Sequence, residues 1–312
     1  MAANWPALPY DEWRETRDTL HRWTQIVGKI RMTLTPLVNH WWNAPLYVTA
    51  HGLTTSKMSV DGGRALDIEF DFLAHVLRFR VSDGRAHDIA LGPRTVADLY
   101  REIFEVLRLL EVRCAIWTMP VEIPGETRAL DRDHDHHHYD HDAVERFWRI
   151  LSLCDGVFTE FRSRFIGKCS PVHFFWGSFD LAVTRFSGRV APQRADADAV
   201  TREAYSHEVS SVGFWPGDDR LKLPSFYSYA APEPEGFRTA RVTPAATYYN
   251  EALGGFYLHY DDVRASHDPE AMLLDYCQTT YEAAADNAQW DRAALERAPQ
   301  THADSVPRAG AE

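Results

Sequence analysis

The fold class is indicated first by one stretch, Cys169-Ser-Pro-Val-His-Phe-Phe-Trp-Gly-Ser-Phe-Asp-Leu-Ala-Val-Thr-Arg-Phe-Ser-Gly188. Its many aromatic and β-branched residues favour β-strands. Three polar residues, His173, Asp180 and Arg185, stand among these apolar neighbours. An unpaired polar group inside a protein costs about 1–3 kcal/mol, so such groups pair with one another, with a ligand or with a metal. The stretch therefore predicts strands that form one wall of a functional pocket.

Helices are predicted on both sides of this stretch, because apolar residues recur there at helical spacing. They cover residues 11–34, 93–110, 143–166 and 269–286. Strands are predicted at 46–49, 65–72, 76–81, 87–91, 112–117, 209–214, 226–229 and 256–260. The tetrapeptide Ser82-Asp83-Gly84-Arg85 is a hairpin signal. Hairpin signals outnumber crossover connections, so we expect an α+β fold with antiparallel sheets and flanking helices.

The second half of the chain repeats the order of the first. One constant shift aligns Pro36 with Pro171, Trp41 with Trp176, Leu46 with Leu181, and Val48-Thr49 with Val183-Thr184. This agreement predicts an internal duplication, with two related helix–strands–helix halves packed into one compact body. The alternative is a coincidence between two amphipathic helices that each end at a proline.

Four parts follow from this organisation. They are a first half (1–130), a linker (131–142), a second half with the candidate site (143–290) and a disordered tail (291–312). The linker, Asp131-Arg-Asp-His-Asp-His-His-His-Tyr-Asp-His-Asp142, is rich in histidine and aspartate. Such tracts bind transition metals weakly, but a flexible acidic linker is the preferred interpretation.

Composition excludes several classes of protein. The chain has 312 residues and a net charge of −12, which argues against binding to nucleic acid or to an anionic membrane. No apolar run is long enough to span a membrane. The four cysteines form no CxxC pair, and the first residues show no secretory signal pattern. We therefore expect a cytoplasmic protein with free thiols.

A metal site is the first candidate for chemistry. His173, His207 and Glu208 offer two imidazoles and a carboxylate, which suit Zn²⁺ or Fe²⁺ and leave positions open for water or substrate. Their spacing matches no established metal motif. The alternative is that His207 caps a turn and Glu208 is solvated.

The second candidate needs no metal. If residues 173–185 form one continuous strand, His173 and Arg185 share one face, while Trp176, Ser178 and Asp180 share the other. Arg185 is then suited to clamp a carboxylate or phosphate, and His173 to act as a general acid or base. With Asp180 and His207, these residues are the predicted catalytic set. The alternative is an Arg185–carboxylate pair that holds two elements together.

Aromatic residues stand beside these polar positions. With His40 and Ser178, the tryptophans Trp41, Trp42, Trp176 and Trp215 are predicted to contact a planar or partly apolar ligand. Such residues are more often part of the core. If the halves pack about a pseudo-twofold axis, residues 40–43 and 173–176 face a shared region.

Four segments resemble a family of uncharacterised bacterial proteins that is known only as a domain of unknown function. They are Trp5-Pro-Ala-Leu-Pro-Tyr-Asp-Glu-Trp13, Leu20-His-Arg-Trp-Thr-Gln-Ile-Val-Gly-Lys29, Cys169 to Gly188, and Arg202-Glu-Ala-Tyr-Ser-His-Glu-Val-Ser-Ser-Val-Gly-Phe-Trp-Pro-Gly217. The resemblance covers about residues 5–290 and implies no activity or cofactor. From the residues themselves we expect an enzyme that acts on a small anionic or partly aromatic molecule, and that uses Zn or Fe if the metal site forms. The alternative is a non-catalytic module that binds a small ligand.

Overall fold

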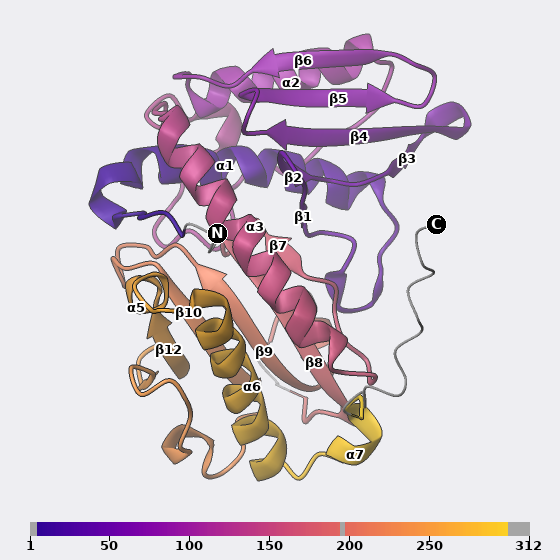
Figure 1. The fold of residues 1–312 in the computed structure, drawn as a ribbon. Helices are drawn as coiled ribbons and strands as arrows, with labels where there is room; N and C mark the ends of the chain where they lie inside the picture. The colour runs from indigo at the N-terminus through magenta and orange to yellow at the C-terminus, as the bar shows by residue number, and fades with distance from the viewer. Residues whose placement is uncertain (1–4, 194–196, 299–312) are drawn as a thin grey trace, which may run out of the picture.

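Two antiparallel sheets and seven α-helices make up the part of the chain that the computed structural model describes, residues 5–193 and 197–298 (Figure 1). The predicted α+β class with antiparallel sheets and flanking helices is confirmed. In each half a long helix is followed by a sheet of six strands and then by a further helix. The duplication itself remains a prediction, because similar element order alone does not establish it.

The first sheet has the strand order β1-β2-β4-β5-β6, with β3 paired to β4. Its strands are β1 (Tyr47–Val48), β2 (Gly52–Thr54), β3 (Met58–Val60), β4 (Arg64–Asp71), β5 (Val76–Val81) and β6 (Ala86–Ala90). The predicted strand at 65–72 forms as β4, and its alternation buries Leu66, Ile68 and Phe70 on one face. On the other face, Arg80 of β5 pairs with Glu69 at 2.9 Å.

The second sheet has the order β11-β12-β10-β9-β8-β7. Its strands are β7 (His173–Phe175), β8 (Asp180–Val190), β9 (His207–Trp215), β10 (Ser225–Ala231), β11 (Tyr248–Asn250) and β12 (Gly255–His259). The continuous strand expected over residues 173–185 is wrong. Residues 176–179 form a turn, in which Phe179 has a positive φ of 61° and Phe179 N donates to Phe175 O. The chain reverses there, so the expected division of faces does not hold.

Capping and proline residues set the ends of the main helices. These helices are α1 (Tyr10–Leu34), α2 (Val96–Leu109), α3 (His141–Ser163) and α6 (Pro269–Asn287), with the short α4 (Ala199–Ala204), α5 (Tyr260–Arg264) and α7 (Arg292–Leu295). α1 ends just before Thr35-Pro36, as predicted. Asp140 and Asp268 cap α3 and α6 through their side chains.

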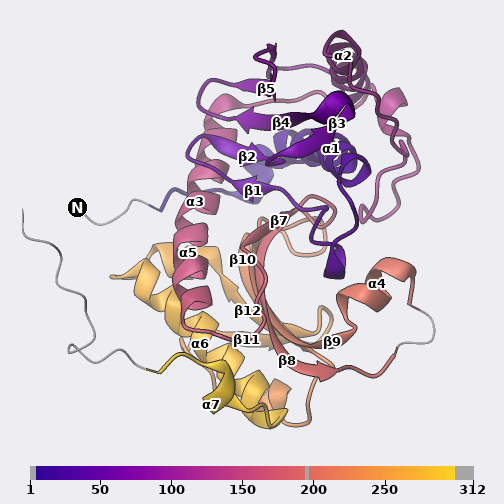
Figure 2. The same ribbon diagram turned by 90° about the vertical axis from the view of Figure 1, so that its right-hand side faces the viewer.

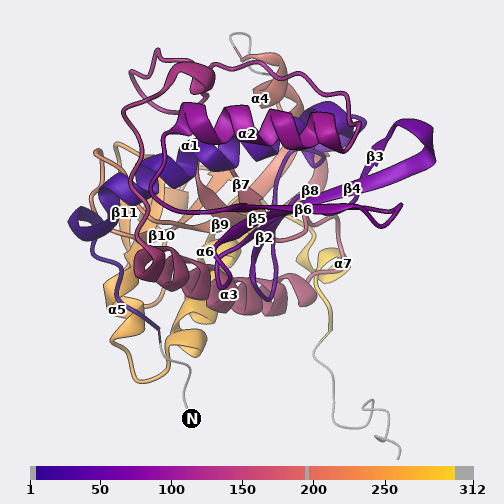
Figure 3. The same ribbon diagram turned by 90° about the horizontal axis from the view of Figure 1, so that it is seen from above.

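Helices cover one face of the second sheet and one face of the first, and α3 also contacts the edge strand β1 of the first sheet. Figure 3 shows α1 and α2 together on the covered face of the first sheet. α3 continues onto the second sheet, where α6 lies beside it (Figure 1). The sheets meet edge to edge at Leu46 and Phe174, whose backbone N–H and C=O groups exchange two hydrogen bonds of 2.9 Å. One hydrophobic core therefore runs through both halves.

Three segments differ from the sequence-based expectation. Residues 112–117 form no strand. The segment that follows them is held to α1 instead, because Lys29 and Gln25 donate hydrogen bonds to the backbone carbonyls of Met119 and Val121. The tract 131–142 is folded onto α1 and α2, with Asp133 only 1% exposed. The expected tail is partly ordered, because the backbone of Ile166 donates to Leu295 O at 2.8 Å. The rest of that tail, 299–312, lies outside the described residues. No helix among the described residues is long and apolar enough to cross a membrane.

Candidate functional site

Polar side chains of the second sheet gather on the face turned away from α3 and α6, which we call the inner face. Figure 2 shows this sheet curved and nearly edge-on, with α3 and α6 outside the curve and α4 facing its inner side. The register places Thr184 of β8 opposite Ser211 of β9, which lies opposite Tyr229 of β10. Since alternate residues of a strand share a face, Asp180 and Tyr227 belong to this face too.

Asp180 stands on this face and is only 5% exposed. Its carboxyl oxygens accept hydrogen bonds from Ser178 Oγ, at 2.5 Å, and from Tyr227 Oη. Gly213 leaves room for the tyrosine, because a Cβ there would lie 2.4 Å from Tyr227 Oη. Burial raises the pKa of Asp180 to about 6, although the two hydroxyl donors act in the opposite direction. This carboxyl can therefore exchange a proton near neutral pH.

Two further hydroxyl pairs continue across the inner face. Thr184 Oγ1 lies 2.9 Å from Ser211 Oγ, and Tyr205 Oη lies 2.9 Å from Tyr229 Oη. Thr184, Tyr205 and Tyr229 are half-buried, so solvent reaches them. The face thus offers a row of hydroxyl groups that can donate or accept hydrogen bonds with a polar ligand.

α1 positions the segment that passes over this face. Gln25 clamps both backbone groups of Val121, because its Nε2 donates to Val121 O at 2.8 Å and its Oε1 accepts from Val121 N at 2.9 Å. His21 Nε2 donates to Gly177 O at 2.8 Å. Burial lowers the pKa of His21 to about 3, so this ring is neutral. One helix thereby fixes both Glu122, the residue after Val121, and the turn before Asp180.

Glu122 is brought to the inner face from the connection between the halves. Its backbone has a positive φ of 57°, which is strained for a residue other than glycine. Its carboxyl lies against Gly177, where a Cβ would come within 2.3 Å of Glu122 Oε1. The residue as a whole is exposed, but protein atoms packed around the carboxyl raise its pKa to about 7, with Asp180 and Asp198 adding to the effect.

His173, a predicted catalytic residue and metal ligand, is completely buried. Its Nε2 lies 3.4 Å from Tyr47 Oη, while its Nδ1 has no hydrogen-bond partner in the described structure. Burial lowers the pKa of His173 to about 3, and the charges of Arg31 and Arg162 lower it further. The ring is therefore neutral at physiological pH and is not suited to donate a proton as an imidazolium.

His40, Lys168 and His207 lie together near the far end of β8 from Asp180. His40 Nε2 is 2.6 Å from Lys168 Nζ, and the ring centroids of His40 and His207 are 5.9 Å apart. Trp42 stands between His40 and His173, with ring centroids at 5.3 Å and 5.9 Å. Residues of the first half thus do approach the His173 strand, in the region that the sequence comparison of the halves suggested.

Arg185 lies on the opposite face from the position predicted for it. The turn at 176–179 aligns His173 with Ala182, so Arg185 points toward α3 and α6. Its guanidinium packs 3.4 Å from the ring centroid of Phe161 and 4.3 Å from that of Tyr281, and it donates to Phe161 O. The side chain is 1% exposed. Arg185 is therefore a core residue and does not share a surface with His173.

The predicted metal site does not form either. His207 and Glu208 are adjacent on β9, so their side chains lie on opposite faces. Glu208 pairs with Arg189 at 2.6 Å, beside a hollow between β9, β10 and α6 that holds this ion pair and mainly apolar side chains. His173 is two strands away on β7. A single ion cannot contact all three side chains in this arrangement.

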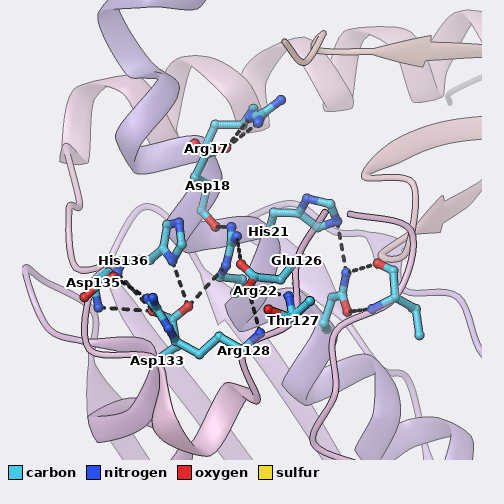
Figure 4. A network of polar contacts seen from close by, with 12 residues as sticks. Arg17, Asp18, His21, Arg22, Glu126, Thr127, Arg128, Asp133, Asp135 and His136 are labelled. Atoms are coloured by element: carbon cyan, nitrogen blue, oxygen red, sulfur yellow. Dashed lines mark hydrogen bonds and ion pairs between the residues drawn. The ribbon is translucent and has the colours of Figure 1, made fainter. Parts of the chain in front are cut away.

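Among the described residues, one trio has the spacing of metal ligands: Glu126, Asp133 and His136 offer ligand atoms within 4.8 Å of one another (Figure 4). Two arginines of the protein already pair with its carboxylates. Arg22 lies 2.5 Å from Glu126 and 3.2 Å from Asp133, and Arg128 lies 3.6 Å from Asp133. We therefore interpret the cluster as a network of ion pairs that holds the His/Asp tract (131–142) against α1.

The tryptophans predicted to bind ligand divide between the inner face and other positions. Trp42 and Trp215 belong to the inner face, and Trp215 is stacked with Arg220 at 5.5 Å. Trp176 is a core residue, whose Nε1 donates to Ala44 O at 2.8 Å. Trp41 is half-buried and has a positive φ of 61°, and its Nε1 has no hydrogen-bond partner among the described residues.

Comparison with known proteins assigns the chain to a family but indicates no activity. The model of one family, described as a family of unknown function (DUF5996), matches residues 5–297. The chain belongs to DUF5996. No curated protein and no solved structure matches it. The family thus accounts for nearly the whole chain, and a function must be inferred from the inner face of this DUF5996 protein.

Three residues of the site were missed by the sequence-based interpretation. Tyr227 had a signal, because Tyr227 and Tyr229 alternate on a predicted strand and so share a face. Lys168 had a weaker signal, as it immediately precedes the strand-forming stretch 169–188. Glu122 had none, because it lies in an irregular segment whose path depends on Gln25.

Replacing Gly177 with alanine tests the position of Glu122. The new Cβ would overlap the carboxyl and displace it, because the end of a glutamate side chain moves more easily than backbone. We expect the pKa of Glu122, followed by NMR of its side-chain carboxyl carbon, to fall from about 7 toward the ordinary value of 4.5. Gly92→Ala is the control, since no atom lies within 4 Å of its Cβ position. An unchanged titration in Gly177→Ala would contradict the placement.

Proposed function

We propose that this protein is an enzyme that binds a small molecule on the inner face, between the two halves, and acts on it by general acid–base catalysis. The observation that supports this most strongly is the pair of carboxyl groups there. Asp180 comes from the second sheet and Glu122 from the segment held by α1. Two carboxyl groups whose surroundings shift their pKa values toward neutrality are typical of acid–base sites.

The two carboxyl groups are suited to different roles. Asp180, with the lower pKa of the two, is ionised first and acts as the base. Glu122 keeps its proton to higher pH and acts as the acid. In each cycle one proton passes from the ligand to Asp180 and one passes from Glu122 to another atom of the ligand. Exchange with solvent then restores both groups.

The surroundings of Glu122 support a catalytic role over a structural one. Its carboxyl has no hydrogen-bond or ion-pair partner within the part of the chain that the structure describes. A strained backbone held by a buried clamp costs free energy, and such strain clusters at functional sites. The four cysteines are free thiols, which fits the cytoplasmic location that we also propose.

The test is turnover by wild type, Asp180→Asn and Glu122→Gln, screened by proton NMR against a mixture of small carboxylates, phosphates and aromatic metabolites. Each variant should lower the rate by at least about 100-fold, the usual contribution of a general acid or base. The rate should rise as Asp180 ionises near pH 6 and fall as Glu122 loses its proton near pH 7. The falling limb should be absent from the residual activity of Glu122→Gln.

Glu105→Gln is the matched control, because Glu105 lies on the exposed surface of α2 and pairs only with Arg108 among the described residues. Its rate should equal that of the wild type. Turnover by both site variants at the wild-type rate would exclude the proposed acid–base pair.

A second candidate, a non-catalytic binding module, is favoured by one observation. Both carboxyl oxygens of Asp180 already accept hydrogen bonds from Ser178 and Tyr227, so Asp180 is also suited to a structural role. In that case a ligand found in the screen would bind without being converted, and Asp180→Asn would change only its affinity.

A further inference from the structure

Lys168 carries a positive charge that no acidic side chain among the described residues balances. No carboxylate oxygen lies within 4.0 Å of its Nζ in the described part of the chain, although the full sequence has a net charge of −12. The Nζ instead lies over the rings of Trp42 and Phe186, at 5.4 Å and 5.1 Å from their centroids. An ammonium group held against aromatic rings, without a counter-ion, is available to an anion from outside the protein.

His40 holds this ammonium group in place and remains neutral. Its Nδ1 donates to Glu203 O at 3.0 Å, so the proton of the neutral ring is on Nδ1 and its Nε2 has a free lone pair. Lys168 Nζ donates to that Nε2 at 2.6 Å. Burial and the nearby Lys168 both lower the pKa of His40, which keeps the ring from adding a second charge. The remaining N–H groups of Lys168 are therefore free to bind a ligand.

His40 itself is fixed by the backbone. It is 6% exposed and has a positive φ of 59°, and its backbone N–H donates to Glu203 Oε1 at 3.2 Å. This strained conformation joins η1 (Asn39–Trp41) to α4, which lies against it. Such strain, held by several contacts, keeps the imidazole aimed at Lys168.

A third polar group and a buried apolar cluster complete the arrangement. The ring of His207 meets that of His40 edge-on, and its Nδ1 is 3.1 Å from Ser206 Oγ, while its Nε2 has no partner among the described residues. Beside it lies a small apolar cluster that is separate from the main core. Its members are Phe186, Val209 and Ala231, with Trp42, Tyr205 and Tyr229 packed against them.

We propose that Lys168, with His40 and His207 beside it, binds the carboxylate or phosphate group of a ligand whose aromatic body lies against Trp42 and Tyr229, the half-buried rings packed against this cluster. The inference deepens the proposed function, because it rests on the ligand occupying the inner face and names the class of that ligand. In this proposal Lys168 binds the anion, a role that the sequence analysis suggested for Arg185. The anion and Asp180 lie at opposite ends of β8, with the hydroxyl row from Tyr229 to Tyr227 between them, so the rest of the ligand extends along this row.

Calorimetric titration with phenyl phosphate, benzoate and the uncharged benzamide tests the proposal. These probes are titrated into wild type, Lys168→Met and Lys222→Met, the last being a control because Lys222 is exposed elsewhere. We expect at least one anion to bind wild type and Lys222→Met alike, and benzamide to bind at least about tenfold more weakly. Lys168→Met should weaken anion binding by at least about tenfold, the effect of losing a charge-assisted hydrogen bond.

The comparison of phenyl phosphate with benzoate shows which anionic group the site prefers. Anion binding by Lys168→Met at wild-type affinity, equal affinity for benzamide and benzoate, or no binding of either anion to wild type up to about 10 mM would each overturn the proposal. Thermal unfolding of Lys168→Met at the wild-type temperature shows that it is folded.

Asp180→Asn separates this inference from the proposed function. Anion binding that survives in Asp180→Asn while turnover is lost supports both. Normal turnover by Asp180→Asn and Glu122→Gln, together with loss of anion binding in Lys168→Met, overturns only the acid–base mechanism.

Discussion

Replacing Gly28 with alanine is expected to destabilise the protein by about 3 kcal/mol, although alanine favours helices over glycine by about 1 kcal/mol. Gly28 lies in the buried middle of α1. A Cβ there would stand 2.2 Å from Cδ1 and Nε1 of Trp176. The indole cannot easily move aside, because it is 7% exposed and its Nε1 donates to Ala44 O. The helix would have to shift instead.

Such a shift would also disturb the inner face, because the same helix carries Gln25 and His21. We therefore expect Gly28→Ala to lose the raised pKa of Glu122 as well as stability. Urea unfolding measures the loss of stability, and carboxyl NMR measures the pKa of Glu122. Gly156→Ala is the matched control. Gly156 is an exposed residue within α3 whose Cβ position has no atom within 4 Å, so this variant should gain about 0.5–1 kcal/mol. Equal stability of the two variants would contradict the close contact of α1 with Trp176.

Replacing Arg185 with alanine is expected to cost about 3–5 kcal/mol of stability, because it leaves a cavity among Phe161, Phe165 and Tyr281. The charged group interacts with these rings and with Phe161 O but has no ionic partner among the described residues. No carboxylate lies within 4.0 Å of the guanidinium in the described residues, and burial lowers the pKa of Arg185 to about 10. A buried cation without an ionic partner is costly, so Arg185→Met, which keeps most of the volume, should be close to wild type or more stable.

Urea unfolding of both variants distinguishes packing from charge. Arg149→Ala serves as the control, since Arg149 is an exposed residue of α3 that pairs with Glu145 at 2.5 Å and should change stability by no more than about 0.5 kcal/mol. If Arg185→Met is as unstable as Arg185→Ala, the guanidinium has a role beyond filling the core. If Arg185→Met also loses the binding of benzoate or phenyl phosphate, the anion clamp originally predicted at Arg185 regains support.

The local elements followed from short-range patterns. Pro36 and Pro269 marked the end of α1 and the start of α6, because proline restricts its neighbour and is tolerated in the first turn of a helix. The alternation in β4 and the hairpin at 82–85 gave the meander of the first sheet. These signals depend only on residues close together in the sequence, so they can be interpreted without knowledge of the rest of the fold.

The error at Arg185 has a specific physical cause. Residues 173–185 have enough aromatic and β-branched residues for one long strand, and these outweighed the turn-favouring residues Gly177, Ser178 and Asp180. Because side chains alternate with a period of two, a turn of four residues changes which residues share a face. His173 therefore joined Asp180, and Arg185 moved to the core.

The sequence by itself determined the α+β class and the positions of the main helices and most strands. It suggested His40, Asp180 and His207 as site residues, but not Glu122, Lys168 or Tyr227. Only the tertiary structure decided which of those residues face one another. It placed Glu122 near Asp180, because α1 holds both the segment with Glu122 and the turn before Asp180. It placed Lys168 beside His40, because the strained turn at His40 is held against α4. Such neighbours depend on packing between distant segments, and no local pattern of residues specifies that packing.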